Sequence, residues 1–151
     1  MLVSSDDRPA ASRVIVQMSS EPYGMAQFNL TKFALFPPYA AVSQKDFMEP
    51  LRVQAIEAAI SRDPSPWISG AGPERKWRAY ITPMSTLFTA AQAYLRMGMY
   101  RRAAGCGRNL KALANRVGDL SIKGEWLENA NQCLDNAKSH TAPSRILSPD
   151  N

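Results

Sequence analysis

The side chains with the clearest chemical potential in this sequence are the cations between Arg75 and Gly118. This stretch carries nine Lys and Arg residues and no Asp or Glu, so no carboxylate within it neutralises their charge. Such a positive field speeds encounters with polyanions and acidic proteins and can supply most of a non-specific nucleic-acid affinity. The pattern favours binding over catalysis. The cations are Arg75, Lys76, Arg78, Arg96, Arg101, Arg102, Arg108, Lys111 and Arg116.

The charge is unevenly divided along the chain. Residues 1–74 carry six basic and eight acidic side chains, whereas residues 75–151 carry twelve basic and five acidic ones. The formal net charge of +5 therefore combines −2 in the first part with +7 in the second. A charged helix face can also serve only to keep a protein in solution, so charge alone does not select a function.

The residues capable of nucleophilic or acid–base catalysis form no recognisable catalytic pattern. The single histidine, His140, lies at the end of an expected helix, and the sequence assigns it no catalytic partner. Asp46, Glu49 and Glu57 share one expected helix, where exposed surface charge is the simpler interpretation. No glycine pattern matches a phosphate-binding loop. We therefore predict that the protein is not an enzyme and has neither catalytic residues nor a cofactor.

The two cysteines, Cys106 and Cys133, lack the close Cys or His neighbours of a zinc site or a redox pair. Buried free thiols are expected. The sequence does not decide whether the two cysteines form a disulfide, because that bond requires their Cα atoms to lie within about 7 Å of each other. No run approaches the roughly 20 apolar residues of a membrane span, and the N-terminus does not resemble a secretory signal. We therefore expect no metal, no membrane partner and a cytoplasmic location.

At 151 residues the chain has the length of one ordinary domain. Residues 1–42 show no sustained periodicity, which predicts an irregular arm or tail. Residues 43–138 predict a helical domain, and the Pro- and Gly-rich loop at 62–73 inside it marks the boundary with the basic half. Residues 139–151 predict a disordered tail. The expected fold class is mainly α.

Apolar residues at steps of three and four predict amphipathic helices over about 44–61, 82–97, 100–117 and 121–138. Thr82 followed by Pro83 is a typical helix start, and Gly98 is a typical helix end. The middle two helices then form a hairpin. Two glycines within a helix cost about 1 kcal/mol each, which a close approach of the two hairpin helices would offset. The small residues available for this approach are Ala103, Ala104, Gly105 and Gly107.

The hairpin resembles a tetratricopeptide repeat, which has small and aromatic residues before a Gly-x-Tyr turn and an alanine early in its second helix. The resemblance covers about residues 82–138 and identifies residues 121–138 as a capping helix. It implies a small helical domain that contains a repeat-like antiparallel hairpin. The matching spacing is Ala91-x-x-Tyr94-x-x-x-Gly98-x-Tyr100-x-x-Ala103.

The resemblance implies a protein or peptide ligand, held by outward positions of the first helices. Those positions are Ser85, Gln92 and Arg96 on one helix and Asn131 on the last. A separate basic stripe on the outer side of the second helix suits an acidic partner. The candidate partner-binding residues are therefore Ser85, Gln92, Arg96, Arg101, Arg102, Arg108, Lys111 and Arg116.

Nucleic acid is the alternative partner for the same basic surface. The segment 113–118 resembles the first helix and turn glycine of a DNA-binding helix-turn-helix, but Glu125 and Glu128 in the next helix would oppose phosphates. We predict a non-enzymatic interaction or regulatory module that binds an acidic protein or peptide, with a nucleic-acid-binding regulatory protein as the alternative. Aromatic residues near the basic surface could stack on bases, namely Trp67, Trp77 and Tyr80.

Overall fold

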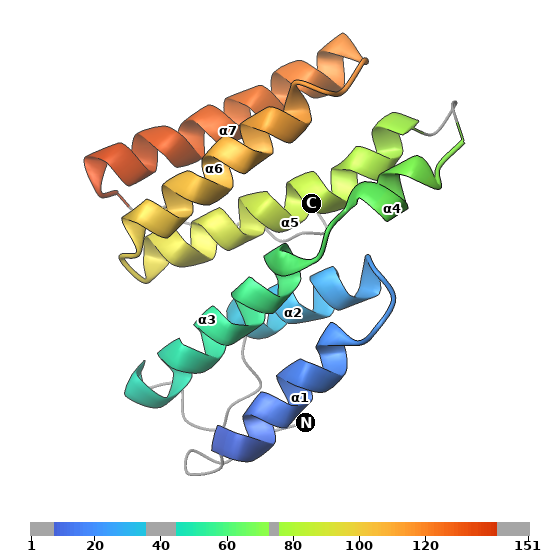
Figure 1. The fold of residues 1–151 in the computed structure, drawn as a ribbon. Helices are drawn as coiled ribbons and strands as arrows, with labels where there is room; N and C mark the ends of the chain where they lie inside the picture. Colours follow the sequence, from blue (N-terminus) through green and yellow to red (C-terminus); the bar gives the residue numbers. More distant parts are fainter. Residues whose placement is uncertain (1–7, 36–44, 73–75, 142–151) are drawn as a thin grey trace. The chain divides into compact units, whose positions relative to one another are not determined.

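The computed structural model describes residues 8–35, 45–72 and 76–141, and all regular secondary structure within them is α-helical (Figure 1). The expected fold class, mainly α, is confirmed. The helices are α1 (Arg8–Ser19), α2 (Met25–Leu35), α3 (Lys45–Ser61), α4 (Ser65–Ser69), α5 (Lys76–Arg96), α6 (Tyr100–Ala114) and α7 (Leu120–Ser139).

The chain divides into two compact units, residues 1–62 and residues 63–151. The first unit contains α1 to α3, and the second contains α4 to α7. The division falls inside the segment 62–73 that was expected as a loop, where Ser65–Ser69 form the short α4. Helix α3 belongs to the first unit, where it packs on α1 and α2, whereas the sequence-based prediction grouped it with the later helices in residues 43–138.

The irregular arm expected for residues 1–42 is wrong over residues 8–35, which form α1 and α2. The buried face of α2 includes the polar side chains of Gln27 and Thr31, which interrupt its apolar stripe. Both helices are also short, so the 3.6-residue period is sampled over only about three turns. Residues 1–7 and 36–42 of that arm, and residues 142–151 of the expected tail, lie outside the described residues.

Gln27 connects α2 to the end of α3 within the first unit. Its side chain is 1% exposed, accepts a hydrogen bond from the backbone N–H of Gly24 at 2.8 Å and donates one to the carbonyl of Ala59 at 3.2 Å. The Ala59 carbonyl belongs to the last turn of α3, where carbonyls have no partner within their own helix. The buried amide therefore caps α3.

Arg62 plays a similar part at the end of α1. Its Nη1 donates to the carbonyl of Glu21 at 2.6 Å and to that of Ser19 at 3.5 Å, and its guanidinium lies 5.6 Å from the ring centroid of Tyr23. A cation beside the C-terminal carbonyls of a helix is electrostatically favourable. The residue at the boundary of the two units is thus part of the first unit's packing.

In the second unit, α5, α6 and α7 each pack against the other two, and α6 lies alongside both neighbours in Figure 1. The turn between α5 and α6 depends on Gly98, whose φ is +75°. The N–H of Met99 donates to the carbonyl of Tyr94 at 2.8 Å, and that of Gly98 donates to Leu95 at 3.1 Å. These bonds form a Schellman motif, so the prediction that Gly98 ends the helix is confirmed.

Gly107 allows a close approach of α6 to α7. A Cβ placed on Gly107 would lie 3.1 Å from Cγ and Cδ2 of Leu134 and 3.5 Å from Cβ of Cys133. The prediction that Gly107 brings the two hairpin helices together is therefore wrong, because its open side faces the third helix. A side chain at this position must displace Leu134.

Helix α5 begins at Lys76, so the predicted start at Thr82 and Pro83 is wrong. A proline inside a helix removes one N–H and leaves the carbonyl four residues earlier without its donor. Here that carbonyl belongs to Ala79, and it accepts a hydrogen bond of 3.0 Å from Nε1 of Trp67. The indole thus replaces the missing backbone donor, which makes Pro83 compatible with a continuous helix.

Replacing Trp67 with phenylalanine should lower the free energy of unfolding by about 1–2 kcal/mol, because the Ala79 carbonyl loses its donor. The same change in a Pro83→Ala background should cost less, because alanine restores the backbone N–H for that carbonyl. Urea denaturation of the four proteins, followed by circular dichroism, measures this coupling. Equal losses in both backgrounds would show that the indole does not replace the missing N–H.

Candidate functional site

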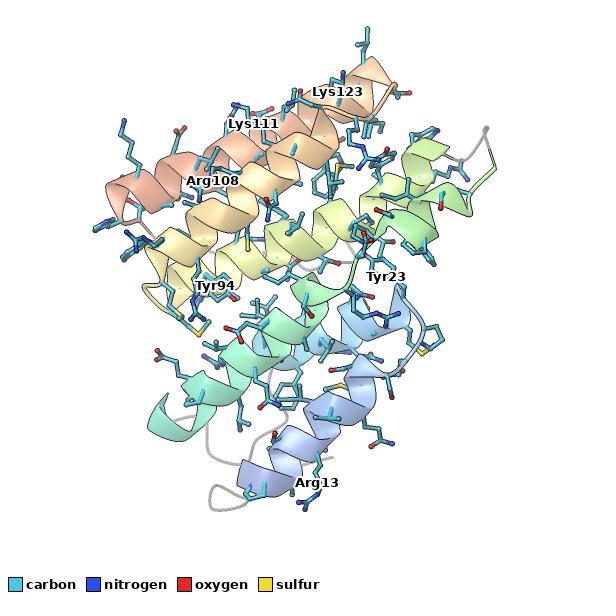
Figure 2. The ribbon with its side chains drawn as sticks, viewed as in Figure 1. Arg13, Tyr23, Tyr94, Arg108, Lys111 and Lys123 are labelled. Atoms are coloured by element: carbon cyan, nitrogen blue, oxygen red, sulfur yellow. The ribbon has the colours of Figure 1, made fainter. Side chains whose placement is uncertain are left out.

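The outer side of α6 carries three exposed cations, Arg101, Arg108 and Lys111, which we call the α6 basic face. Helical geometry places them within about 80° of one another around the axis and spreads them over about 15 Å along it. The opposite side of the helix packs into the second unit and is apolar, so the charged side must face solvent. Figure 2 shows Arg108 and Lys111 on this helix.

None of the three residues of the α6 basic face makes an ion pair or hydrogen bond with a side chain in the part of the chain that the structure describes. The sequence from Arg75 to Gly118 contains no carboxylate, so no neighbouring residue of α6 can pair with them. A row of cations on a rigid helix is a pre-organised surface for a complementary row of anions.

Two other predicted binding residues, Arg102 and Arg116, lie against aromatic rings of α5. The guanidinium of Arg102 is 6.0 Å from the ring centroid of Tyr94, and that of Arg116 is 5.4 Å from that of Tyr80. These distances are typical of cation–π interactions. Both arginines are exposed but contact the ring of a buried tyrosine, so they contribute to packing as well as to surface charge.

The outward positions implied by the repeat resemblance are not equally accessible. Gln92 is only 4% exposed, which corrects its expected outward placement, and Ser85 is half-buried. The buried surface of α5 is wider than one apolar stripe and includes polar side chains such as Thr89. Arg96, in the last turn of α5, is exposed, as is Asn131 on α7. Of the candidate positions on α5, Arg96 is therefore exposed, whereas Gln92 and Ser85 are largely covered.

His140 occupies a structural position at the end of α7. Its φ of 56° is left-handed, the conformation that ends the helix, and the N–H of Thr141 donates to the carbonyl of Asn136 at 2.9 Å. The imidazole stacks on the ring of Tyr100 with a centroid distance of 4.3 Å and an interplanar angle of 3°. This contact joins the end of α7 to the start of α6.

Cys106 and Cys133 are free and buried, which confirms the expected buried thiols. Burial raises the pKa of the Cys106 thiol to about 11. Burial, together with the nearby Cys106, raises the pKa of the Cys133 thiol to about 12. Both groups are therefore protonated at neutral pH, and a protonated thiol is neither a nucleophile nor a metal ligand.

Among residues 8–35, 45–72 and 76–141, no cluster of three or more His, Cys, Asp or Glu side chains could hold a metal ion. No helix among them is both long and apolar enough to cross a membrane.

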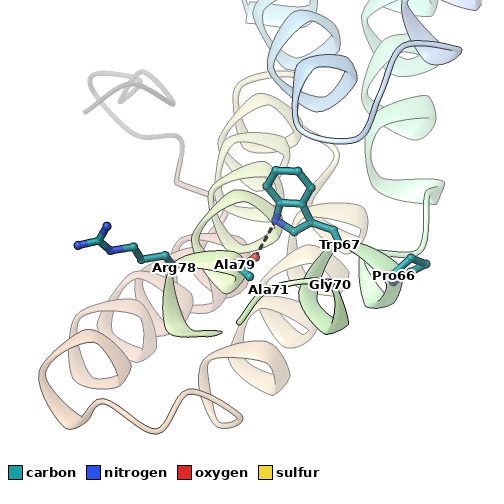
Figure 3. Close-up of a pocket in the computed structure, with 6 residues that line it drawn as sticks. All are labelled: Pro66, Trp67, Gly70, Ala71, Arg78 and Ala79. Atoms are coloured by element: carbon teal, nitrogen blue, oxygen red, sulfur yellow. Dashed lines mark hydrogen bonds between the residues drawn. The ribbon is translucent and has the colours of Figure 1, made fainter. Parts of the chain in front are cut away.

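The second unit also contains a cavity of about 490 Å³, between α4 and the start of α5 (Figure 3). The sequence singles out Trp67 but does not reveal this cavity, because its other wall exists only when α5 begins before Thr82. The lining residues are Pro66, Trp67, Gly70, Ala71, Arg78 and Ala79.

Comparison with protein-family models, with curated proteins and with solved structures gives no match to this chain. The tetratricopeptide-repeat resemblance therefore stays a prediction.

Proposed function

We propose that this protein is a non-enzymatic interaction module that binds an acidic segment of a partner protein through the α6 basic face. The observation that carries the proposal is the row of exposed cations, Arg101, Arg108 and Lys111, which form no ion pair with any carboxylate of residues 8–35, 45–72 and 76–141. A partner segment with carboxylates spread over about 15 Å would match this row. Arg102 and Arg116 would add to the same field from positions held by aromatic rings.

Two observations favour an acidic protein over nucleic acid. The tyrosine rings that lie against Arg116 and Arg102, Tyr80 and Tyr94, belong to residues only 4% and 2% exposed, so they offer no face on which a base could stack. The neighbouring helix α7 exposes the carboxylates of Glu125 and Glu128, which would repel an extended phosphate backbone. A short acidic peptide on α6 avoids both difficulties. Nucleic acid is therefore the alternative outcome of the test.

Replacing Arg101, Arg108 and Lys111 together with glutamine should weaken the binding of a labelled oligoglutamate peptide by about tenfold or more, because each exposed charge pair contributes up to about 1 kcal/mol. Fluorescence anisotropy at two salt concentrations measures this. The matched control replaces Arg13, Lys32 and Lys138 with glutamine, which changes the net charge equally at exposed positions outside the α6 basic face.

The proposal predicts a small effect of the control variant and a large effect of the α6 variant. Equal losses of peptide affinity in both variants would mean that only the overall charge matters, which contradicts a defined site. Labelled duplex DNA and single-stranded RNA are titrated in the same way. Tighter binding to either nucleic acid than to the peptide, with steep salt dependence and loss in the α6 variant, would replace the proposal with the nucleic-acid alternative.

A further inference from the structure

Helix α7 carries an exposed row of carboxylates that has the same length as the α6 basic face. The row consists of Glu125, Glu128 and Asp135, which we call the α7 acidic face. Helical geometry places the three residues within about 80° of one another around the axis and spreads them over about 15 Å along it. None of the three carboxylates makes an ion pair with a cation of residues 8–35, 45–72 and 76–141.

The spacings of the two charged faces are the reverse of each other. The cations of the α6 basic face are separated by seven and then by three positions, whereas the carboxylates of the α7 acidic face are separated by three and then by seven. Two antiparallel helices are read in opposite directions, so the two spacings then coincide. Every cation stands opposite a carboxylate in one register. The pairs are Arg101 with Asp135, Arg108 with Glu128, and Lys111 with Glu125.

These pairs do not form within one chain. Helices α6 and α7 already pack against each other, through sides that include Gly107 and Leu134. The two charged faces lie on the exposed sides of the same helices and make no ion pair with each other. The charge complementarity between them can therefore be used only by two molecules.

Short residues between the charges permit a close approach of two such helices. On α6, a Cβ at Gly105 would meet only the end of the Arg108 side chain, at 3.9 Å, and Ala112 is exposed. On α7, a Cβ at Gly124 would have no other atom within 4 Å. Ala112 and Gly124 lie opposite each other in the antiparallel register, so no bulky side chain separates the helices there.

We infer that the α6 basic face binds the α7 acidic face of a second copy of this chain, with the two helices antiparallel. The inference rests on the proposed function, because it names the acidic segment that the α6 basic face binds. The two faces are different surfaces, so each copy can bind with one and be bound through the other. Exposed charge pairs are individually weak and are screened by salt, so the association is reversible and salt-dependent.

Sedimentation equilibrium of the full chain at low and high salt measures this self-association. We expect the mean mass of the wild-type protein to exceed that of one chain at low salt and to fall as salt is added. Reversing the charges of the α6 basic face should weaken the association at least about tenfold. This α6 reversal variant carries Arg101→Glu, Arg108→Glu and Lys111→Glu.

The matched control reverses three exposed cations outside both charged faces, with Arg13→Glu, Lys32→Glu and Arg78→Glu. It changes the net charge as much as the α6 reversal variant does and should retain the association. Both changes bring the net charge of +5 closer to zero, which by itself favours association. Loss of association in the α6 reversal variant therefore runs against the effect of net charge. An equal loss in the control overturns the inference.

A charge-swap mixture tests the direct contact between the two faces. Reversing the α7 acidic face should also weaken self-association, with Glu125→Lys, Glu128→Lys and Asp135→Lys. In an equal mixture of the two reversal variants, each face again meets a face of opposite charge on the other molecule, so association should return. Failure of the mixture to associate, when circular dichroism shows both variants to be folded, overturns the inference.

The oligoglutamate titration separates the failure of this inference from that of the proposed function. A wild-type protein that stays monomeric at low salt, but binds the peptide through the α6 basic face, overturns the inference and leaves the proposed function intact. Absence of both self-association and peptide binding overturns both.

Discussion

Replacing Gly107 with leucine should lower the free energy of unfolding by about 3 kcal/mol, the upper range for overpacking of a closely packed interface. Even a Cβ at this position would lie 3.1 Å from the side chain of Leu134, so the remaining leucine atoms require α6 and α7 to separate. Urea denaturation followed by tryptophan fluorescence measures the loss, because all three tryptophans, Trp67, Trp77 and Trp126, belong to the second unit.

Gly105 provides a matched control on the same helix. A Cβ there would meet only the far end of the Arg108 side chain, at 3.9 Å. Gly105→Leu should therefore be neutral or stabilising by up to about 1 kcal/mol, since leucine favours the helix over glycine. Similar destabilisation by both substitutions would contradict the packing argument, because it would show that position within α6 does not decide the effect.

Replacing Gln27 with leucine should lower the free energy of unfolding by about 3 kcal/mol. Leucine fits the volume of the site but offers no polar atom, so the Gly24 N–H and the buried Ala59 carbonyl both lose their partner. Each such group costs about 1–3 kcal/mol when it is left unsatisfied. Circular dichroism at 222 nm during urea denaturation measures the loss, because it follows the helices of both units.

Gln17→Leu is the control for this prediction, because Gln17 is exposed on α1 and the same substitution there removes no buried amide. We expect it to change stability by less than about 0.5 kcal/mol. If Gln27→Leu were as mild as this control, the capping role of the buried amide at the end of α3 would be wrong.

The helices of the basic half could be predicted because their signals are local. The apolar spacing of α6 and α7 is regular, and Gly98 supplies the left-handed conformation at which α5 must end. The α6 basic face follows from the same spacing, because residues seven and three apart share one side of a helix. Local periodicity is therefore sufficient to predict that Arg101, Arg108 and Lys111 lie on the same side of α6.

The first unit could not be predicted in the same way. The core side of α2 includes Gln27 and Thr31, whose polarity conceals the helical pattern, and they become favourable only when hydrogen bonds satisfy them. Thr31 bonds to the carbonyl of Gln27 within α2, whereas Gln27 needs the end of α3. The hydrogen bond from Gln27 to Ala59 joins residues 32 positions apart, so the spacing of neighbouring residues cannot predict it.

Taken alone, the sequence determined the mainly helical fold, the turn at Gly98 and the acid-free cationic side of α6, because each depends on neighbouring residues of one helix. Tertiary structure decided which helix Gly107 approaches, that Gln92 is buried, and that α5 continues through Pro83. The physical reason is that burial and hydrogen-bond satisfaction depend on distant partners. Trp67 shows this directly, since its indole supplies the donor that Pro83 lacks and thereby forms one wall of the cavity.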